Sequence, residues 1–417
     1  MSSRILTHIK QLINARSGNK PLRGHELGKL STVEDAWLLI EGKEVAGYGK
    51  MDALKKTHKH LPEEEIDCSG RLVLPCWCDS HTHLVFAGSR EKEFVDRLRG
   101  LSYAEIHARG GGILNTVQQV DQTSEDELFN LAWKRIAEMA ATGTGALEIK
   151  SGYGLMVENE LKMLRVIKKL KQKSNLPIRS TFLGAHSYPP QFRNSHAGYI
   201  KQIADDMLPV IAREKLADYI DVFCETGFFS PRETETILQA GLKHGLKPKL
   251  HTNQLESIGG ITTGIKLNAV SMDHLETMTA TDIRHIRDDG WKGICTLLPT
   301  AAFFLGLPVP PARKLIEANA AIALASDYNP GSSPSGNMHF VLSLACIQMK
   351  MLPEEALNAA TINGAHAMGL GASCGSLFAG KLANLVITRP VPSLAYLPYA
   401  FGSNHIDKVM IAGEFIS

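Results

Sequence analysis

One stretch of sequence decides the fold: Pro75-Cys76-Trp77-Cys78-Asp79-Ser80-His81-Thr82-His83-Leu84. It carries the chain from an apolar segment, Leu72–Leu74, into two histidines one residue apart. On an extended backbone alternate side chains share a face, so His81 and His83 point the same way at the end of a strand, with Asp79 on that face too. Two convergent imidazoles are half of a zinc or iron site. Paired histidines also occur on wet surfaces and in cores, so the other half has to come from later in the chain.

Downstream of this motif, short buried strands alternate with amphipathic helices. Counting from Leu72–Asp79, the later predicted strands are Ala146–Lys150, Ile178–Leu183, Tyr219–Phe223, Lys247–His251, Ala269–Ser271, Gly293–Leu297 and Ala321–Ala325. Between them lie helices such as Ser124–Ala141, which opens with the capping box Ser124-x-x-Glu127. This alternation predicts an α/β fold, a (β/α)8 TIM-like barrel. A doubly wound open sheet is the alternative, but no G-x-G-x-x-G or Walker loop follows any strand.

The two ends of the chain have a different texture, with short β-segments broken by turns. Ala36–Glu41 and Glu44–Tyr48 are predicted strands near the N-terminus, and Leu385–Thr388 and Lys408–Ile411 are predicted near the C-terminus. Neither end is long enough to make a sheet alone. We therefore expect residues 1–74 together with 375–417 to form one small β-sandwich-like domain, beside a metal-dependent catalytic barrel of residues 75–374.

The composition is that of an ordinary globular enzyme. Of 417 residues 44% are apolar and 21% charged, and 45 basic against 43 acidic residues give a net charge of +2. This balance provides no field for nucleic acid or an anionic membrane, so neither is an expected partner. The seven cysteines are odd in number and scattered, which argues against a disulfide framework. Because the sequence also lacks an N-terminal signal segment and any apolar run near the roughly 18 residues of a spanning helix, we expect a cytoplasmic protein.

Histidines recur where barrel chemistry takes place, at the C-terminal ends of the strands. The strand-end residues of interest are His81, His83, His186, His251, His274 and Asp327. Scattered at random, 16 histidines would rarely occupy five such positions. His81, His83, His251 and Asp327 supply three neutral imidazoles and one carboxylate, a set suited to Zn²⁺ or Fe²⁺ with one position left for water.

The pattern Pro-x-x-x-Asp-x-His-x-His on strand one, with His on strands five and six and Asp on strand eight, resembles the amidohydrolase superfamily. Three longer motifs, His83–Glu91, Glu148–Gly154 and Asp327–Pro334, are similar to those of the imidazolonepropionase family within it. The similarity runs from about residue 20 to the C-terminus. It implies hydrolysis of the cyclic amide of 4-imidazolone-5-propanoate to N-formimidoyl-L-glutamate, the third step of histidine degradation, by a homodimer.

The resemblance also bears on the number of metal ions. Binuclear amidohydrolases bridge their metals with a carbamylated lysine at the end of strand four, and Asp221–Gly227 contains no lysine. Lys150 stands at the end of strand two, where we expect it to pair with a carboxylate such as Glu148. One divalent or trivalent ion, zinc or iron, is therefore predicted.

Two strand-end residues are expected to take part in the chemistry. A metal ion can lower the pKa of a bound water to about 7, giving hydroxide at neutral pH for attack on the ring carbonyl. Asp327, holding the metal, would take and relay the proton. His274 is not needed as a ligand, and as a donor to the carbonyl oxygen it would stabilise the developing oxyanion.

Loops after the strands are expected to bind the substrate. Arg90 would hold the propanoate as a planar cationic fork, although a surface arginine paired with Glu91 or Glu93 is the alternative. The other predicted contacts are Tyr153, His186, Gln254, Asn329, Gly331 and Ser332. Gln254 stands where some family members carry Glu, and an amide cannot act as a base. For the turn from Asn329 to Ser332 a purely structural role is the alternative, and the run Gly110-Gly111-Gly112 is expected to approach the site as a loop that opens no helix.

Two other interpretations stay open on the sequence. Another cyclic amidohydrolase, or a deaminase acting on guanine or cytosine, could have an identical metal set, but a nucleobase deaminase has little use for Arg90 with Ser332. A non-catalytic barrel kept as an assembly scaffold would tend to lose ligands, whereas all four predicted ligands are present.

Overall fold

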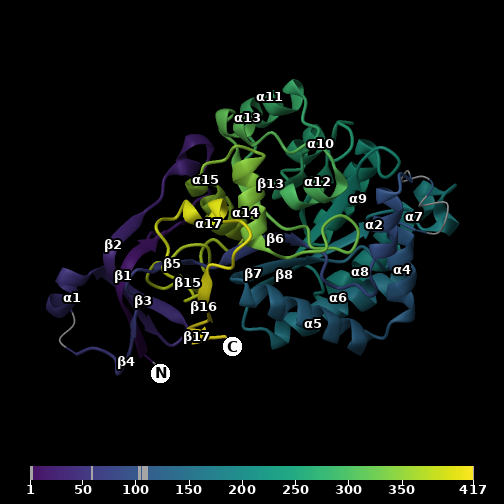
Figure 1. Ribbon diagram of the computed structural model, residues 1–417. Helices are drawn as coiled ribbons and strands as arrows, with labels where there is room; N and C mark the ends of the chain where they lie inside the picture. The colour runs from purple at the N-terminus through teal and green to yellow at the C-terminus, as the bar shows by residue number, and fades with distance from the viewer. Residues whose placement is uncertain (1–2, 58–59, 102–104, 106–110, 417) are drawn as a thin grey trace.

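The chain is organised around a barrel of parallel strands (Figure 1). The computed structural model describes residues 3–57, 60–101, 105 and 111–416. In this part of the chain the barrel strands pair in the order β6-β7-β8-β9-β11-β12-β13-β14, with β10 beside β9. Their bounds are β6 (Trp77–Thr82), β7 (Thr144–Lys150), β8 (Ile178–Ala185), β9 (Tyr219–Cys224), β10 (Lys247–Pro248), β11 (Leu250–Thr252), β12 (Ser271–His274), β13 (Ile294–Leu297) and β14 (Ala321–Leu324). The predicted α/β barrel is confirmed.

The barrel closes between β6 and the segment that follows β14. The backbone N–H of Asp327 donates to the carbonyl of His81 at 3.0 Å, and the N–H of His83 donates to the carbonyl of Tyr328 at 2.9 Å. Thr82 and Tyr328 form a parallel bridge there. We call this junction the closing seam, and residues of the predicted site lie in it.

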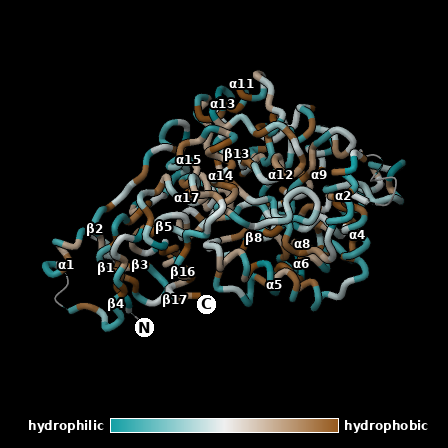
Figure 2. The backbone as a smooth tube through the Cα atoms, in the orientation of Figure 1, coloured by the Kyte–Doolittle hydropathy of each residue, from teal (hydrophilic) through white to brown (hydrophobic). Residues whose placement is uncertain are grey.

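Helices surround the barrel, and most of them turn an apolar face towards the strands. Those before and along the first half are α2 (Glu91–Leu98), α4 (Ile113–Gln122), α5 (Glu125–Ala141), α6 (Val157–Lys173), α7 (His196–Gln202), α8 (Leu208–Glu214) and α9 (Pro231–Lys243). The later ones are α10 (Gly260–Lys266), α11 (Ala280–Asp288), α12 (Pro299–Leu305), α13 (Ala312–Glu317), α14 (Met338–Ile347), α15 (Pro353–Asn358) and α16 (Gly364–Ala367). In α5 the Ser124 hydroxyl accepts from the N–H of Glu127, and Leu128, Ala132 and Ile136 are buried. The alternation of hydrophilic and hydrophobic segments along such helices is visible in Figure 2.

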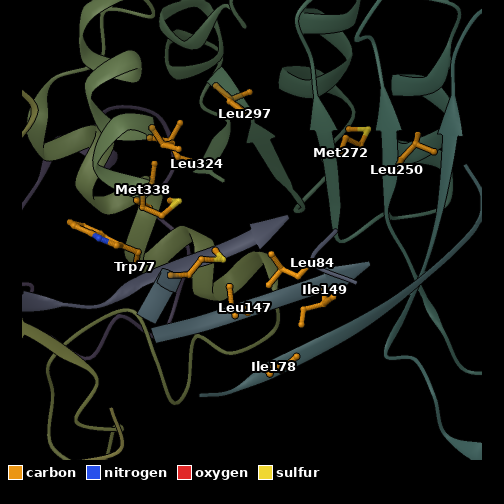
Figure 3. Close-up of a cluster of buried hydrophobic side chains, with 14 of the residues drawn as sticks. Trp77, Leu84, Leu147, Ile149, Ile178, Leu250, Met272, Leu297, Leu324 and Met338 are labelled. Atoms are coloured by element: carbon orange, nitrogen blue, oxygen red, sulfur yellow. The ribbon is translucent and has the colours of Figure 1, made fainter. Parts of the chain in front are cut away.

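Apart from the short β10, the barrel strands are buried on both faces. In β7, Leu147 and Ile149 belong to the main apolar cluster, whereas Glu148 and Lys150 are buried within a polar barrel interior. Figure 3 shows side chains of that cluster from successive strands: Leu147, Ile149, Ile178, Leu250, Met272, Leu297 and Leu324, with Trp77 and Met338. The alternation of a strand thus directs apolar side chains to the helices and polar ones to the barrel axis.

The two ends of the chain form a second sheet, seen where purple and yellow strands lie together in Figure 1. In the described residues its order is β17-β16-β15-β5-β1-β2-β3, with β4 beside β1. The strands are β1 (Ser3–Ile13), β2 (Thr32–Glu41), β3 (Glu44–Lys50), β4 (Glu64–Asp67), β5 (Leu72–Pro75), β15 (Leu385–Thr388), β16 (Ile406–Ile411) and β17 (Glu414–Phe415). Pairing is antiparallel except where β4 and β5 pair with β1. The division of the chain into domains at residues 74 and 374 stays a prediction.

The predicted first barrel strand, Leu72–Asp79, needs a correction. Its first half is β5, which pairs with β15 and β1 in the terminal sheet. Only the second half, β6, pairs with β7 in the barrel. Both halves are buried and mostly apolar, so the sequence did not reveal that the chain passes from one sheet to the other at Cys76.

Three further expectations concern loops, thiols and membrane spans. Gly110 lies outside the described residues, while Gly112 has φ 82° and directly precedes α4, so the expectation that this run opens no helix is wrong. All seven cysteines are free. No helix in the described ranges combines the length and the apolar character required to cross a membrane.

Candidate active site

A cavity of about 470 Å³ lies at the C-terminal ends of the barrel strands. Its walls include nearly every predicted site residue: His83, Arg90, Tyr153, His186, His251, Gln254, His274, Asp327, Asn329, Gly331 and Ser332. His81 is fully buried and contacts this set from behind. The structure therefore brings all the predicted residues together. Sequence reasoning missed the apolar part of the wall, including Phe223, Phe228 and Leu307, and a second arginine, Arg97.

Four imidazoles gather beside Asp327. The ring centres of His81 and His251 are 4.4 Å apart, and those of His251 and His274 are 5.5 Å apart. Nε2 of His81 and Nε2 of His83 each lie 3.5 Å from Asp327 Oδ1. Potential ligand atoms lie within 4.8 Å of one another in two overlapping groups of three residues. One group is His81, His251 and His274, and the other is His81, His83 and Asp327. The predicted ligands are thus spread over both groups, and His81 is common to them.

The orientation of two imidazoles fits a bound cation. His81 Nδ1 lies 2.7 Å from Asp273 Oδ2, and His251 Nδ1 lies 3.0 Å from Asp221 Oδ2. Their Nε2 atoms are buried without a hydrogen-bond partner among the described residues, and Nδ1 of His251 meets Asp221 at ion-pair distance without an aligned hydrogen bond. Such orphaned polar atoms are uncommon in folded proteins. A carboxylate behind Nδ1 with Nε2 left free is the usual arrangement of a metal-binding histidine.

The protonation state of the imidazoles also suits a metal. Burial lowers the pKa of His81, His83 and His251 well below the usual range of a histidine. All three side chains are therefore neutral near pH 7, the form in which an imidazole binds a metal ion.

A group of buried ion pairs lies next to these imidazoles. Lys150 Nζ is 2.7 Å from Glu148 Oε1, 2.8 Å from Asp221 Oδ2 and 3.5 Å from Asp273 Oδ2. Lys249 pairs with the other oxygen of Glu148. All five side chains are fully buried. The predicted pairing of Lys150 with Glu148 is confirmed, whereas the contacts to the two aspartates were missed because they join distant strands.

His274 and Asp327 reach the site through an unusual backbone. Their φ values are 83° and 53°. Residues other than glycine seldom adopt this backbone region, and those that do are concentrated at functional sites. His274 Nδ1 lies 3.2 Å from the buried Glu276. Burial by itself lowers the pKa of His274, but the neighbouring carboxylates of Glu276, Asp327 and Asp273 together outweigh this effect and the pKa is raised. Burial raises the pKa of Asp327 to about 6.

Arg90 is held in place by a neighbour on α2. Its Nε donates to Glu93 Oε2 at 2.8 Å, and Glu93 also accepts from the Gly112 N–H and the Asn115 side chain. The pairing considered as the alternative thus exists, yet the guanidinium still lines the cavity. A Cβ added to Gly331 would collide with that guanidinium, so glycine permits the close approach.

His186 and Tyr153 lie side by side in the cavity wall, with ring centres 5.4 Å apart. Nδ1 of His186 lies 3.0 Å from the Gly152 carbonyl. Burial lowers the pKa of His186 to about 4, so the ring is neutral. With its proton on Nδ1 towards that carbonyl, Nε2 of His186 is an acceptor.

The loop after β11 is fixed by a carboxylate that sequence reasoning missed. The consecutive backbone N–H groups of Gln254, Leu255 and Glu256 donate to the buried Glu225, at distances of 2.9 to 3.1 Å. The sequence showed only that Glu225 follows a predicted strand. Its hydrogen-bond partners come after the neighbouring strand β11. The position of Gln254 in the cavity wall depends on this residue.

The side-chain amide of Asn329 is used entirely within its own turn. Its Oδ1 accepts from the N–H groups of Gly331 and Ser332, both at 2.8 Å. Its Nδ2 donates to the Asp327 carbonyl at 2.6 Å and to the Ser332 hydroxyl at 2.7 Å. Ser332 Oγ in turn donates to Asp327 Oδ2 at 2.9 Å. The turn therefore orients the Asp327 carboxylate.

Comparison with known proteins agrees with this geometry. The sequence profile of the amidohydrolase family matches residues 72–416. Imidazolonepropionases of Christiangramia forsetii and Flavobacterium johnsoniae are 51% and 52% identical over 413 residues, covering 99% of this chain and 99% of each relative. An adenosine deaminase from Xanthomonas campestris with bound zinc has the same fold, with a TM-score of 0.69 and 16% identity over 99% of this chain and 92% of that one. The chain belongs to the amidohydrolase family and, within it, to the imidazolonepropionases, hydrolases of histidine degradation.

Proposed function

We propose that this protein opens the ring of 4-imidazolone-5-propanoate with one metal ion, held by His81, His83, His251 and Asp327, to give N-formimidoyl-L-glutamate. The observation that carries the proposal is the convergence of three neutral imidazoles and a carboxylate on a cavity that also presents Arg90. Zinc and iron both suit this donor set. The zinc in the structurally similar deaminase supports a divalent ion.

The ion, when bound, would supply Lewis-acid activation of water and of the ring carbonyl. Asp327 is then the proton acceptor, because its carboxylate borders the cavity and lies beside the imidazoles of His81 and His83. His274, with Nδ1 beside Glu276, can carry a second proton on Nε2 and donate it in a hydrogen bond to the ring oxygen as negative charge develops there. Water adds to the carbonyl carbon, the ring C–N bond breaks, and the proton from water ends on the released nitrogen.

The cavity walls fit the remaining groups of the substrate. Arg90 presents its two terminal nitrogens to the propanoate, since its Nε is occupied by Glu93. His186 Nε2 can accept from a ring N–H, and the hydroxyls of Tyr153 and Ser332 and the amide of Gln254 can contact ring and carboxylate atoms. Asn329 and Gly331 act here by shaping the turn that brings Ser332 and Arg90 together. We also propose that the protein is cytoplasmic and forms a homodimer, as the family resemblance implies. Sedimentation of the purified protein would test the dimer.

The direct test is the loss of ultraviolet absorbance from freshly generated imidazolone propanoate. Metal-replete protein should abolish the absorbance, and guanine and adenosine should be unchanged as controls for the deaminase alternative. Unchanged absorbance of the imidazolone with protein that contains stoichiometric metal would contradict the substrate assignment. Protein without stoichiometric metal would contradict the proposed metal site.

A further inference from the structure

The buried ion pairs beside the metal-site imidazoles are shared in a particular way. Asp221 Oδ2 lies 2.8 Å from Lys150 Nζ and 3.0 Å from His251 Nδ1. Asp273 Oδ2 lies 3.5 Å from the same Nζ and 2.7 Å from His81 Nδ1. One ammonium group thus contacts both of the oxygen atoms that face the two imidazoles.

We propose that Lys150 is a positioning residue for metal binding, acting through Asp221 and Asp273 on His251 and His81. This inference rests on the proposed metal site. Three fully buried carboxylates, including Glu148, share two ammonium groups in this interior. Lys150 is the one that lies between the two aspartates.

Removing the Lys150 ammonium would leave both aspartate oxygens without their common cationic partner. Asp221 would keep the backbone N–H of His251, which donates to its Oδ1 at 3.1 Å, and its Oδ2 would lose the restraint that directs it to the ring. If the carboxylate that faces Nδ1 can rotate, the imidazole ring is no longer held in one orientation, and Nε2 is no longer directed at the metal site. Outer-shell partners of this kind change metal affinity by about ten- to hundredfold when they are replaced.

The chain offers a matched control in Lys249. This side chain is as fully buried as Lys150 and pairs with the same Glu148. Its Nζ lies 5.2 Å from the centre of the Tyr219 ring, and within the described residues it forms no ion pair with Asp221 or Asp273. Replacing Lys249 therefore removes an equivalent buried charge, which acts on Asp221 and Asp273 only at longer range, and leaves the direct ion pairs of the oxygens that face the imidazoles in place.

The test compares Lys150→Met with Lys249→Met after removal of metal. Zinc affinity is measured by competition with a chromophoric chelator, and the melting temperature of each metal-free variant is recorded. Lys150→Met should weaken zinc binding about ten- to hundredfold and alter the visible spectrum of bound Co²⁺. Lys249→Met should lower the melting temperature to a similar degree while keeping the affinity and the spectrum of the original chain.

Equal weakening in both variants, or unchanged affinity in folded Lys150→Met, would overturn the inference. If Lys150→Met does not fold, Lys150→Gln takes its place, because the amide keeps a donor but no charge. Zinc binding by that variant as tight as in the original chain would overturn it as well. Failure of the original chain itself to bind zinc or iron would instead refute the proposed metal site.

Discussion

Asp327 joins two parts of the molecule through different atoms. Its carboxylate borders the cavity and lies 3.5 Å from two imidazole nitrogens, while its backbone N–H closes the barrel onto His81. Substitution by asparagine preserves size and backbone but removes the charge and the proton acceptor. At the scale of a single residue, this position links the chemistry to the fold.

We expect Asp327→Asn to abolish turnover, with a loss of at least about 10²- to 10⁴-fold, the usual contribution of a general base. The measurement is the initial rate of ultraviolet absorbance loss at saturating substrate. Ser332→Ala is the comparison, because it keeps the carboxylate and removes the hydroxyl that donates to Asp327 Oδ2 and accepts from Asn329 Nδ2, so at saturating substrate it should cost much less. Wild-type turnover in a folded Asp327→Asn chain would exclude this carboxylate from the mechanism.

Arg90→Ala should mainly raise KM. A hydrogen bond to a charged group contributes about 1.5–3 kcal/mol, which corresponds to roughly a ten- to hundredfold weaker substrate affinity. Arg90→Lys keeps the charge without the planar fork, so its KM should fall between that of the original chain and that of Arg90→Ala. A variant that lost kcat with KM unchanged would show that Arg90 does not act by binding the propanoate.

The residues of the site could be predicted from the sequence to the extent that their position on a strand determines their direction. His81, His83 and Asp327 project from strand ends, so the barrel alone brings them to one cavity. Glu225 and Glu276 could not be predicted, because their roles depend on which N–H or imidazole of a distant segment lies opposite. The role of Asn329 was ambiguous for a similar reason: only the structure shows its amide fully used inside the turn.

At the scale of an element, the turn from Asn329 to Ser332 connects the metal ligand to the substrate contact. Gly331→Ala should displace the Arg90 guanidinium, since the added Cβ would occupy its position. We expect a KM effect in the direction of Arg90→Ala, with little change in melting temperature. Gly402→Ala is the matched control, because a Cβ there has no described neighbour within 4 Å. Unchanged KM in Gly331→Ala would mean that Arg90 has an equally good alternative position.

Elements with strong local signals were predicted well. The helix over Ser124–Ala141 has a cap and an apolar face, and the structure places α5 there. The division of Leu72–Asp79 between two sheets was missed because burial looks the same in either sheet. Partner choice is a long-range property, and a local apolar pattern does not contain it.

At the scale of the whole molecule, we propose that residues 1–74 and 375–417 form one domain. β15 pairs with β5, and the Arg4 side chain contacts Glu414, so the two ends of the chain depend on each other. A chain ending at residue 374 should therefore lose its cooperative thermal transition, measured by circular dichroism. A chain ending at residue 413 loses β17 and the Arg4–Glu414 contact but keeps the pairing of β15 with β5, and it is the control, expected to melt cooperatively. A normal transition in the shorter chain would contradict the proposed domain.

Removal of the metal ion should lower the melting temperature of the whole chain. An ion that binds only the folded state stabilises it by about 2.7 kcal/mol at a concentration 100 times its Kd. Scanning calorimetry before and after chelation measures the shift, and adding zinc or iron back should reverse it. Asp327→Asn should show a smaller shift than the original chain, and an identical shift would place the ion elsewhere.

The closing seam has a consequence for what happens to the barrel when the metal ion is lost. The two backbone hydrogen bonds that join β6 to the segment after β14 belong to His81, His83, Asp327 and Tyr328, three of which are proposed ligands. We therefore expect loss of the ion to weaken the junction between the first and last strands. Faster deuterium uptake at the amides of His83 and Asp327 in the metal-free chain than in the metal-bound chain would show that the ion helps to hold the barrel closed.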